Sequence, residues 1–169
     1  MAAPGFPVEF GNVSSRVELR ELTHGSQFRS GDVTITSALL NHPGGVLGYR
    51  IEFGGRTLVY ATDTEHSDVI DPALRDLASG ADLLIYDAQY TPEEYPSKVG
   101  WGHSTFEAAC ALARVAGVKR LALFHHDPRR DDEGVFLVEH RAQALFAGAI
   151  AAREGMSFEL HSGGIARAA

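Results

Sequence analysis

The sequence predicts a layered domain of the α/β or α+β class. Its first third consists of strand-like segments separated by turns, whereas strand-like and helix-like segments alternate in the remainder. The 169 residues are 44% apolar and 22% charged, as in an ordinary globular protein. The apolar runs are too short for a membrane span. One globular domain, or part of a larger one, is therefore expected.

The N-terminal strands are indicated by apolar patterns and turn residues. Residues 16–22 suggest a short strand, residues 24–32 a turn with a hairpin return, and residues 33–40 a further strand. Residues 46–53 alternate, placing Leu47, Tyr49, Ile51 and Phe53 on one face. Gly54-Gly55 predicts a tight turn to a partner strand at 56–62, whose continuous apolar character predicts burial on both faces.

Helix signals appear in the second half of the chain. Asp71 followed by Pro72 predicts a capped helix that ends near Gly80. Ser104 and Glu107 form a capping box for a helix that continues to about Ala116. The other expected elements are buried strands at 82–88 and 120–124, a structured loop at 89–103, a long helix from about Gly134 to Gly155, and a last strand at 156–160.

Charge and cysteine usage restrict the function classes. A formal charge of −7 argues against broad, charge-driven binding of nucleic acid. The N-terminus shows no signal-peptide pattern, and the single Cys110 excludes an internal disulfide. We therefore expect a cytoplasmic protein, and the acidic charge is compatible with a small phosphorylated substrate held by a metal.

Three side chains that can bind a metal follow strand-like segments. His42, Asp63 and His125 each come just after an apolar run, so a sheet can bring them together at one edge. Two imidazoles and a carboxylate form a metal-binding set. The alternatives are ordinary: Asp63 as a turn residue that caps its own backbone, and His42 as a loop histidine. Because adjacent strand residues point to opposite faces, only one of His125 and His126 should face a given site.

His103 precedes a predicted helix N-terminus, which attracts anions. A histidine there can orient a phosphate or protonate a leaving group, unless it merely packs on Trp101. Asp87 ends a strand, as Asp63 nearly does, and can hydrogen-bond a metal-binding histidine from behind. For Asp87, Glu65 and Asp127 alike, capping and turn formation is the favoured interpretation.

Four segments resemble the C-terminal half of metallo-β-lactamase-fold hydrolases, in the branch that contains ribonuclease Z and a cyclic phosphodiesterase. They occur in the family's order within residues 33 to 160: Asn41-His42 with Gly48-Tyr49-Arg50, Tyr60 to Thr64, Gly102 to Thr105, and Leu123 to His125. The resemblance implies an α+β fold, with one mixed sheet and helices on its outer face. This is half of the family's αββα sandwich, a single partial domain over residues 1–169.

The resemblance also implies roles. His42 would bind the first metal, Asp63 would bridge two metals, and His125 would bind the second. Asp63 and His103 are the implied catalytic residues, with His103 beside the scissile phosphate. The implied reaction is phosphodiester cleavage by metal-activated hydroxide, with zinc or manganese as the cofactor.

The family's His-x-His-x-Asp-His segment is absent from this chain. A truncated hydrolase with one metal or none is therefore expected. The alternatives are a non-catalytic remnant with weak or no metal binding, and a lactone or thioester hydrolase on the same scaffold.

The expected partners follow from the same argument. The substrate would be a small-molecule or nucleotide phosphodiester, with no membrane as a partner and with nucleic acid as a disfavoured but open alternative. Half of a sandwich would leave the inner, apolar face of its sheet exposed to water. If that face covers several hundred Å2, at about 25 cal/mol per Å2 its exposure would cost on the order of 10 kcal/mol of folding free energy. Such a chain should be marginally stable, or form a homodimer through that face.

Overall fold

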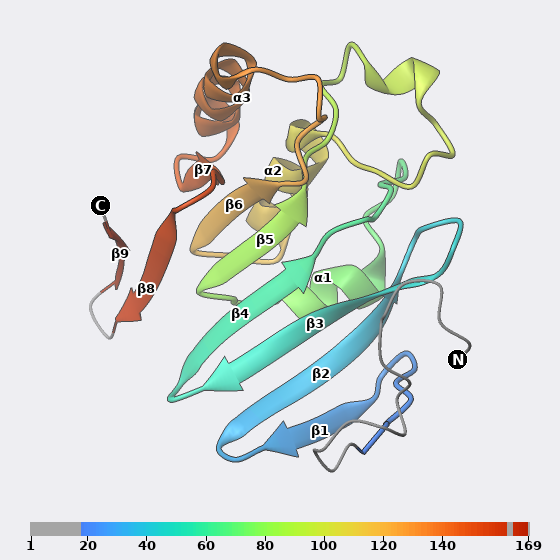
Figure 1. The fold of residues 1–169 in the computed structure, drawn as a ribbon, viewed down its shortest axis with the longest axis vertical. Helices are drawn as coiled ribbons and strands as arrows, with labels where there is room; N and C mark the ends of the chain where they lie inside the picture. The colour runs from blue at the N-terminus through green and yellow to red at the C-terminus, as the bar shows by residue number, and fades with distance from the viewer. Residues whose placement is uncertain (1–17, 162–163, 169) are drawn as a thin grey trace, which may run out of the picture.

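The computed structural model describes residues 18–161 and 164–168. Its main feature is one seven-stranded sheet with the strands in chain order (Figure 1). Strands β1 to β4 are antiparallel, and β4 to β7 are parallel, so the sheet is mixed. The strands are β1 (Gln27–Ser30), β2 (Val33–Leu40), β3 (Val46–Phe53), β4 (Arg56–Ala61), β5 (Leu83–Asp87), β6 (Arg120–Phe124) and β7 (Ala149–Ala151).

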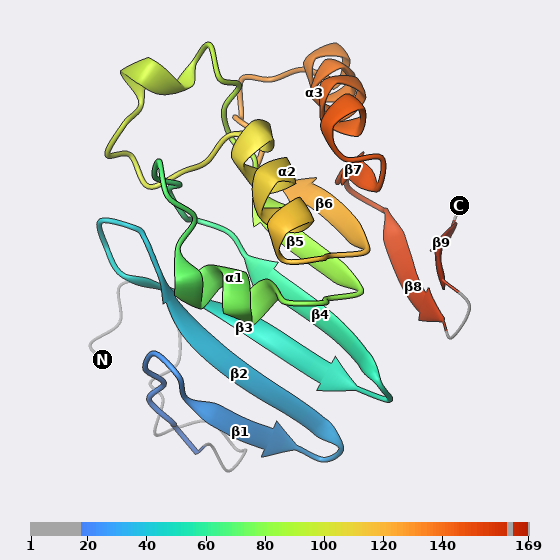
Figure 2. The same ribbon diagram turned by 180° about the vertical axis from the view of Figure 1, so that it is seen from behind.

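Helices cover one face of this sheet, as Figure 2 shows. Helix α1 (Pro72–Ala78) joins β4 to β5, α2 (Phe106–Val115) joins β5 to β6, and α3 (Asp132–Leu145) joins β6 to β7. The core lies between sheet and helices, where Val59, Leu84 and Phe106 are fully buried. A separate antiparallel hairpin follows, made of β8 (Ser157–His161) and β9 (Gly164–Ala168). The predicted α+β class, with one mixed sheet and helices on one face, is confirmed.

Among the described residues, no helix lies on the other face of the sheet (Figure 1). Register places apolar pairs such as Tyr49 and Tyr60 together on this face. Tyr60 is 38% exposed and Phe124 40%, whereas Val59 on the helix side is fully buried. The prediction that residues 56–62 are buried on both faces is therefore wrong for this chain. A homodimer through this open face stays a prediction.

Local patterns located most elements. Strands β2, β3 and β6 have the predicted bounds, and a turn at Gly54-Gly55 joins β3 to β4. The carboxylate of Asp71 accepts a hydrogen bond from the amide of Ala73, as expected of the cap of α1. Within the part of the chain that the structure describes, no helix is long and apolar enough to cross a membrane.

Three predicted elements differ from the structure. Residues 18–22 form no strand, because no neighbouring strand pairs with them, and residues 16–17 lie outside the described residues. The cap of α2 is Thr105, not Ser104, because the Ser104 hydroxyl is buried and donates to the carbonyl of Thr64. Helix α3 ends at Leu145, not Gly155, since residues 149–151 pair with the edge of β6 as β7.

Candidate metal centre

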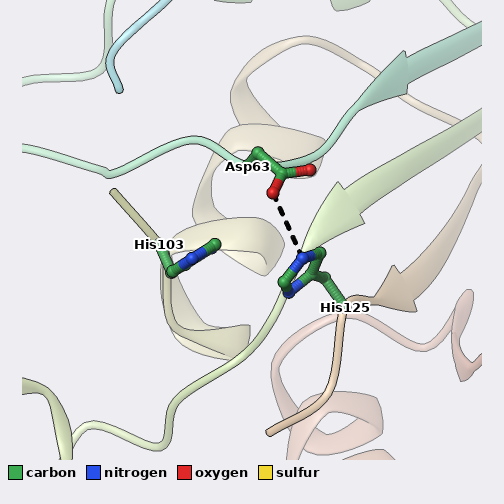
Figure 3. A group of neighbouring side chains, drawn as sticks. All are labelled: Asp63, His103 and His125. Atoms are coloured by element: carbon green, nitrogen blue, oxygen red, sulfur yellow. Dashed lines mark ion pairs between the residues drawn. The ribbon is translucent and has the colours of Figure 1, made fainter. Parts of the chain in front are cut away.

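Three side chains converge beyond the ends of the parallel strands (Figure 3). Asp63 follows β4, His125 follows β6 directly, and His103 lies in the loop before α2. One ligand atom from each lies within 4.8 Å of the others. Asp63 Oδ1 is 3.2 Å from His125 Nε2, and the rings of His103 and His125 stack at 4.7 Å. We call these three residues the Asp63 trio.

The backbone is strained at two members of the trio. Asp63 has φ 55° and His125 has φ 58°, and no other non-glycine residue in the described ranges has a positive φ. Such a conformation costs about 1 kcal/mol or more for a residue with a side chain, and it persists where surrounding contacts enforce it. Both strained residues point into the same small space, which is typical of a functional constraint.

Asp87 is the anchor behind the trio. Its carboxylate is fully buried and accepts four hydrogen bonds: from the amides of Asp63 (3.0 Å), Gln89 (3.1 Å) and Ser104 (3.0 Å), and from Nδ1 of His103 (2.8 Å). A buried carboxylate needs such partners, because an unpaired buried charge is costly. Asp87 thereby joins the segments that carry Asp63 and His103. The sequence suggested a hydrogen bond from Asp87 to a metal-binding histidine, whereas its partner is His103, the histidine with a predicted catalytic role.

Hydrogen bonding determines which nitrogen each ring presents. Nδ1–H of His103 donates to Asp87, so Nε2 is left to face Asp63 and His125. Nδ1 of His125 lies 3.4 Å from the Gln89 amide nitrogen, and the Gln89 amide oxygen is buried without a partner. A half-turn of that amide would let its oxygen accept from Nδ1–H and free Nε2 of His125 for a metal. Nε2 of His125 and the Asp63 carboxylate are then donors that suit a divalent metal such as zinc, with Nε2 of His103 beside them.

His42 lies beside the trio, not within it. Its ring centre is 6.0 Å from that of His103, and its Nδ1 accepts a hydrogen bond from the amide of Gly44 at 3.1 Å. A neutral imidazole that accepts at Nδ1 carries its proton on Nε2, which in this orientation is a donor and not a ligand atom. The structure therefore brings together Asp63, His125 and the predicted catalytic His103, and it leaves His42 one ring away.

Two neighbouring residues behave as the sequence suggested. His126 is not part of the trio, so only one of the two adjacent histidines faces it, as expected. The strand alternation invoked from the sequence is not the reason, because β6 ends at Phe124 and His125 has φ 58°. Burial lowers the pKa of the His126 ring. Asp127 shapes the turn after β6 by accepting from the amide of Arg129 and pairing with its guanidinium. The hydrogen bond from the Arg129 side chain lowers the pKa of Asp127 to about 2.

Glu65 has a larger part in the site than the sequence suggested. Its carboxylate accepts hydrogen bonds from the Tyr95 hydroxyl and from the amides of Gly100 and Gly102. Burial acts to raise the pKa of Glu65, but these bonds outweigh it, and the pKa lies below its ordinary value. The sequence patterns also gave no indication that Gln89 belongs to the site. Neither Glu65 nor Gln89 stands in a recognisable motif, because the groups that each of them contacts lie in loops elsewhere in the chain.

Comparison with known proteins gives a consistent result. The model of the "Beta-lactamase superfamily domain" family matches residues 2–126. Ribonuclease Z of Brevibacillus brevis is 42% identical over 96 residues, which is 54% of this chain and 29% of that protein. Ribonuclease Z of Rippkaea orientalis is 33% identical over 63% of this chain and 33% of its own length. The matched part thus spans about a third of these curated relatives.

Solved structures share the fold. The metallo-beta-lactamase fold protein YhfI from Bacillus subtilis aligns with a TM-score of 0.63 and 25% identity, over 75% of this chain and 48% of that one. The short form of human tRNase Z aligns with a TM-score of 0.53 and 26% identity, over 60% of this chain and 39% of its own.

Proposed function

This chain belongs to the beta-lactamase superfamily, whose domain model matches residues 2–126, and on that premise we propose that it is part of a metal-dependent hydrolase of phosphodiester bonds. The observation that carries the proposal is the Asp63 trio, anchored by the buried Asp87 at the ends of neighbouring parallel strands. The likeness to ribonuclease Z favours phosphodiesters over lactones or thioesters as the substrate class.

The residues would divide the work as follows. Asp63 and His125, 3.2 Å apart, would hold the metal, and His42 would join them after its ring turns away from Gly44. Zinc or manganese suits this set of imidazole and carboxylate donors. When bound, the metal would polarise a phosphoryl oxygen and activate water.

His103 would contact the phosphoryl group. Asp87 fixes its Nδ1 proton at 2.8 Å, so the ring cannot turn without breaking that bond. Nε2 of His103 then faces Asp63 and His125. There a protonated ring can donate to an anionic oxygen or to a leaving group. Only 15% of the His103 side chain is exposed, which limits the competition from water for that bond.

The test is hydrolysis of bis-p-nitrophenyl phosphate, cyclic nucleotides and lactones by the chain loaded with zinc or manganese. We expect phosphodiester turnover that a chelator abolishes, and a fall of roughly a hundredfold or more in His103→Asn with metal uptake retained. His140→Asn, at an exposed position on α3, is the matched control. Hydrolysis of lactones alone would overturn the substrate class. Loss of metal uptake in His103→Asn would overturn the role of His103 and make it a ligand.

A further inference from the structure

Glu65 connects the chain segments that carry the site histidines. It lies two residues after Asp63, and its backbone pairs with Asn41, the neighbour of His42. The amide of Glu65 donates to the carbonyl of Asn41 at 2.7 Å, and the Asn41 side chain donates to the carbonyl of Glu65 at 2.9 Å. The segment that carries Asp63 is therefore tied to the segment that carries His42.

The side chain of Glu65 extends to the opposite side, toward the loop before α2. One carboxylate oxygen accepts from the Tyr95 hydroxyl at 2.8 Å and from the amide of Gly100 at 2.7 Å. The other accepts from the amide of Gly102 at 2.9 Å. Hydrogen bonds to an ionised carboxylate are stronger than those between neutral groups. The loop is therefore held at the residue that directly precedes His103.

Gly102, which donates to Glu65, also lies against the site histidines. Its φ is 88°, and a Cβ atom placed there would lie 2.3 Å from Cδ2 of His42. The backbone at Gly102 is thus packed directly on the His42 ring, and the next residue is His103. A shift of Gly102 would displace both histidines, because one ring rests on it and the other follows it in the chain.

We infer that Glu65 is a positioning residue, which aims His103 and seats the ring of His42 by holding Gly100 and Gly102 with its carboxylate. It is not expected to touch metal or substrate. This inference rests on the proposed function for its catalytic meaning, but the placement of His103 can be measured without metal.

The test compares two substitutions that remove the same charge from the same region. Glu65→Gln preserves size, but in either amide orientation its NH2 group faces a glycine N–H, at Gly102 or at Gly100. Glu93→Gln is the matched control. Glu93 is an exposed carboxylate in the same loop, and it pairs with Arg141 on α3, away from the trio.

The first measurement is made on metal-free protein by NMR. In Glu65→Gln we expect the amides of Gly100 and Gly102 to exchange with solvent roughly tenfold faster or more, since each has lost a charge-assisted bond. The Nδ1 proton of His103 should also exchange faster, whereas Glu93→Gln should match the wild type at all three positions. Unchanged exchange in a folded Glu65→Gln protein, or equal changes in both variants, would overturn the inference.

The second measurement is phosphodiester turnover by the metal-loaded protein. Loss of a group that orients a site residue costs about 10- to 100-fold in activity, and we expect this loss in kcat more than in KM. If the wild type neither takes up metal nor turns over substrate, the proposed function fails, and the metal-free NMR comparison still decides the role of Glu65.

Tyr95→Phe provides a second variant if Glu65→Gln does not fold. It removes one of the three donors and leaves both glycine bonds in place. A smaller rise in the exchange of the Gly100 amide, about threefold, is expected because the Tyr95 hydroxyl helps to hold the Glu65 carboxylate in place against that amide. No rise at Gly100 would overturn the inference.

Discussion

Asp63 and Asp87 occupy similar places, near the ends of the neighbouring parallel strands β4 and β5, yet their surroundings are opposite. Asp87 is fully buried and accepts four hydrogen bonds. The side chain of Asp63 is 40% exposed, accepts one bond from the Thr62 hydroxyl, and lies 3.2 Å from His125. Its backbone is also strained, whereas Asp87 sits in a regular strand.

This difference indicates that Asp87 has a structural role and Asp63 a role in binding. The acceptor sites of Asp87 are used by the protein, so it stabilises the fold and aims His103. Asp63 retains unused lone pairs and is kept in a costly conformation, as expected of a group that binds something the chain does not itself supply. Stability should therefore depend on Asp87, and metal binding on Asp63.

The largest expected effect is on stability. Asp87→Asn replaces an acceptor oxygen with a donor at a fully buried site, and we expect it to lower the free energy of unfolding by about 3 kcal/mol. The same change at Asp63 should cost less than about 1 kcal/mol, because water can replace its partners. Urea denaturation of both variants measures this, and equal losses would contradict the division between the two residues.

The next effect is on metal uptake. Asp63→Ala should abolish binding of zinc and manganese, a fall of roughly a hundredfold or more, because it removes the only carboxylate of the trio. Asp68→Ala, which removes an exposed carboxylate five residues further on, should bind metal like the wild type. Elemental analysis and calorimetric titration provide the measurement. Normal metal content in Asp63→Ala would show that Asp63 is not a metal ligand.

The smallest effect concerns backbone strain. Because Asp63 has a positive φ, Asp63→Gly should be more stable than Asp63→Ala by about 1 kcal/mol. At Asp87, in an extended strand, the order should reverse, with Ala more stable than Gly. Thermal melting of the four metal-free variants tests the reversal. The same order at both positions would mean that strain at Asp63 plays no part.

Sequence patterns predicted those features that depend on neighbouring residues. The apolar runs defined β2, β3 and β6, and Asp71 with Pro72 marked the start of α1. They also identified Asp63 and His125 as site candidates, because both follow buried strands. Helix α3 was predicted too long, since Ala149 continues the helical spacing while the edge of β6 recruits it into β7.

The sequence by itself determined the family, through four motifs in the family's order, and with it the mixed sheet that this resemblance implied. Apolar runs, which are local properties of the chain, marked the two strand-end residues that meet. Only the tertiary structure placed His103 in the trio and left His42 beside it. It alone also revealed the hydrogen bonds from Gly100 and Gly102 to the Glu65 carboxylate, and the contact between the Gln89 amide and Nδ1 of His125. Those contacts join loops far apart in the chain, and hydrogen bonds between such loops depend on their paths, which no local pattern specifies.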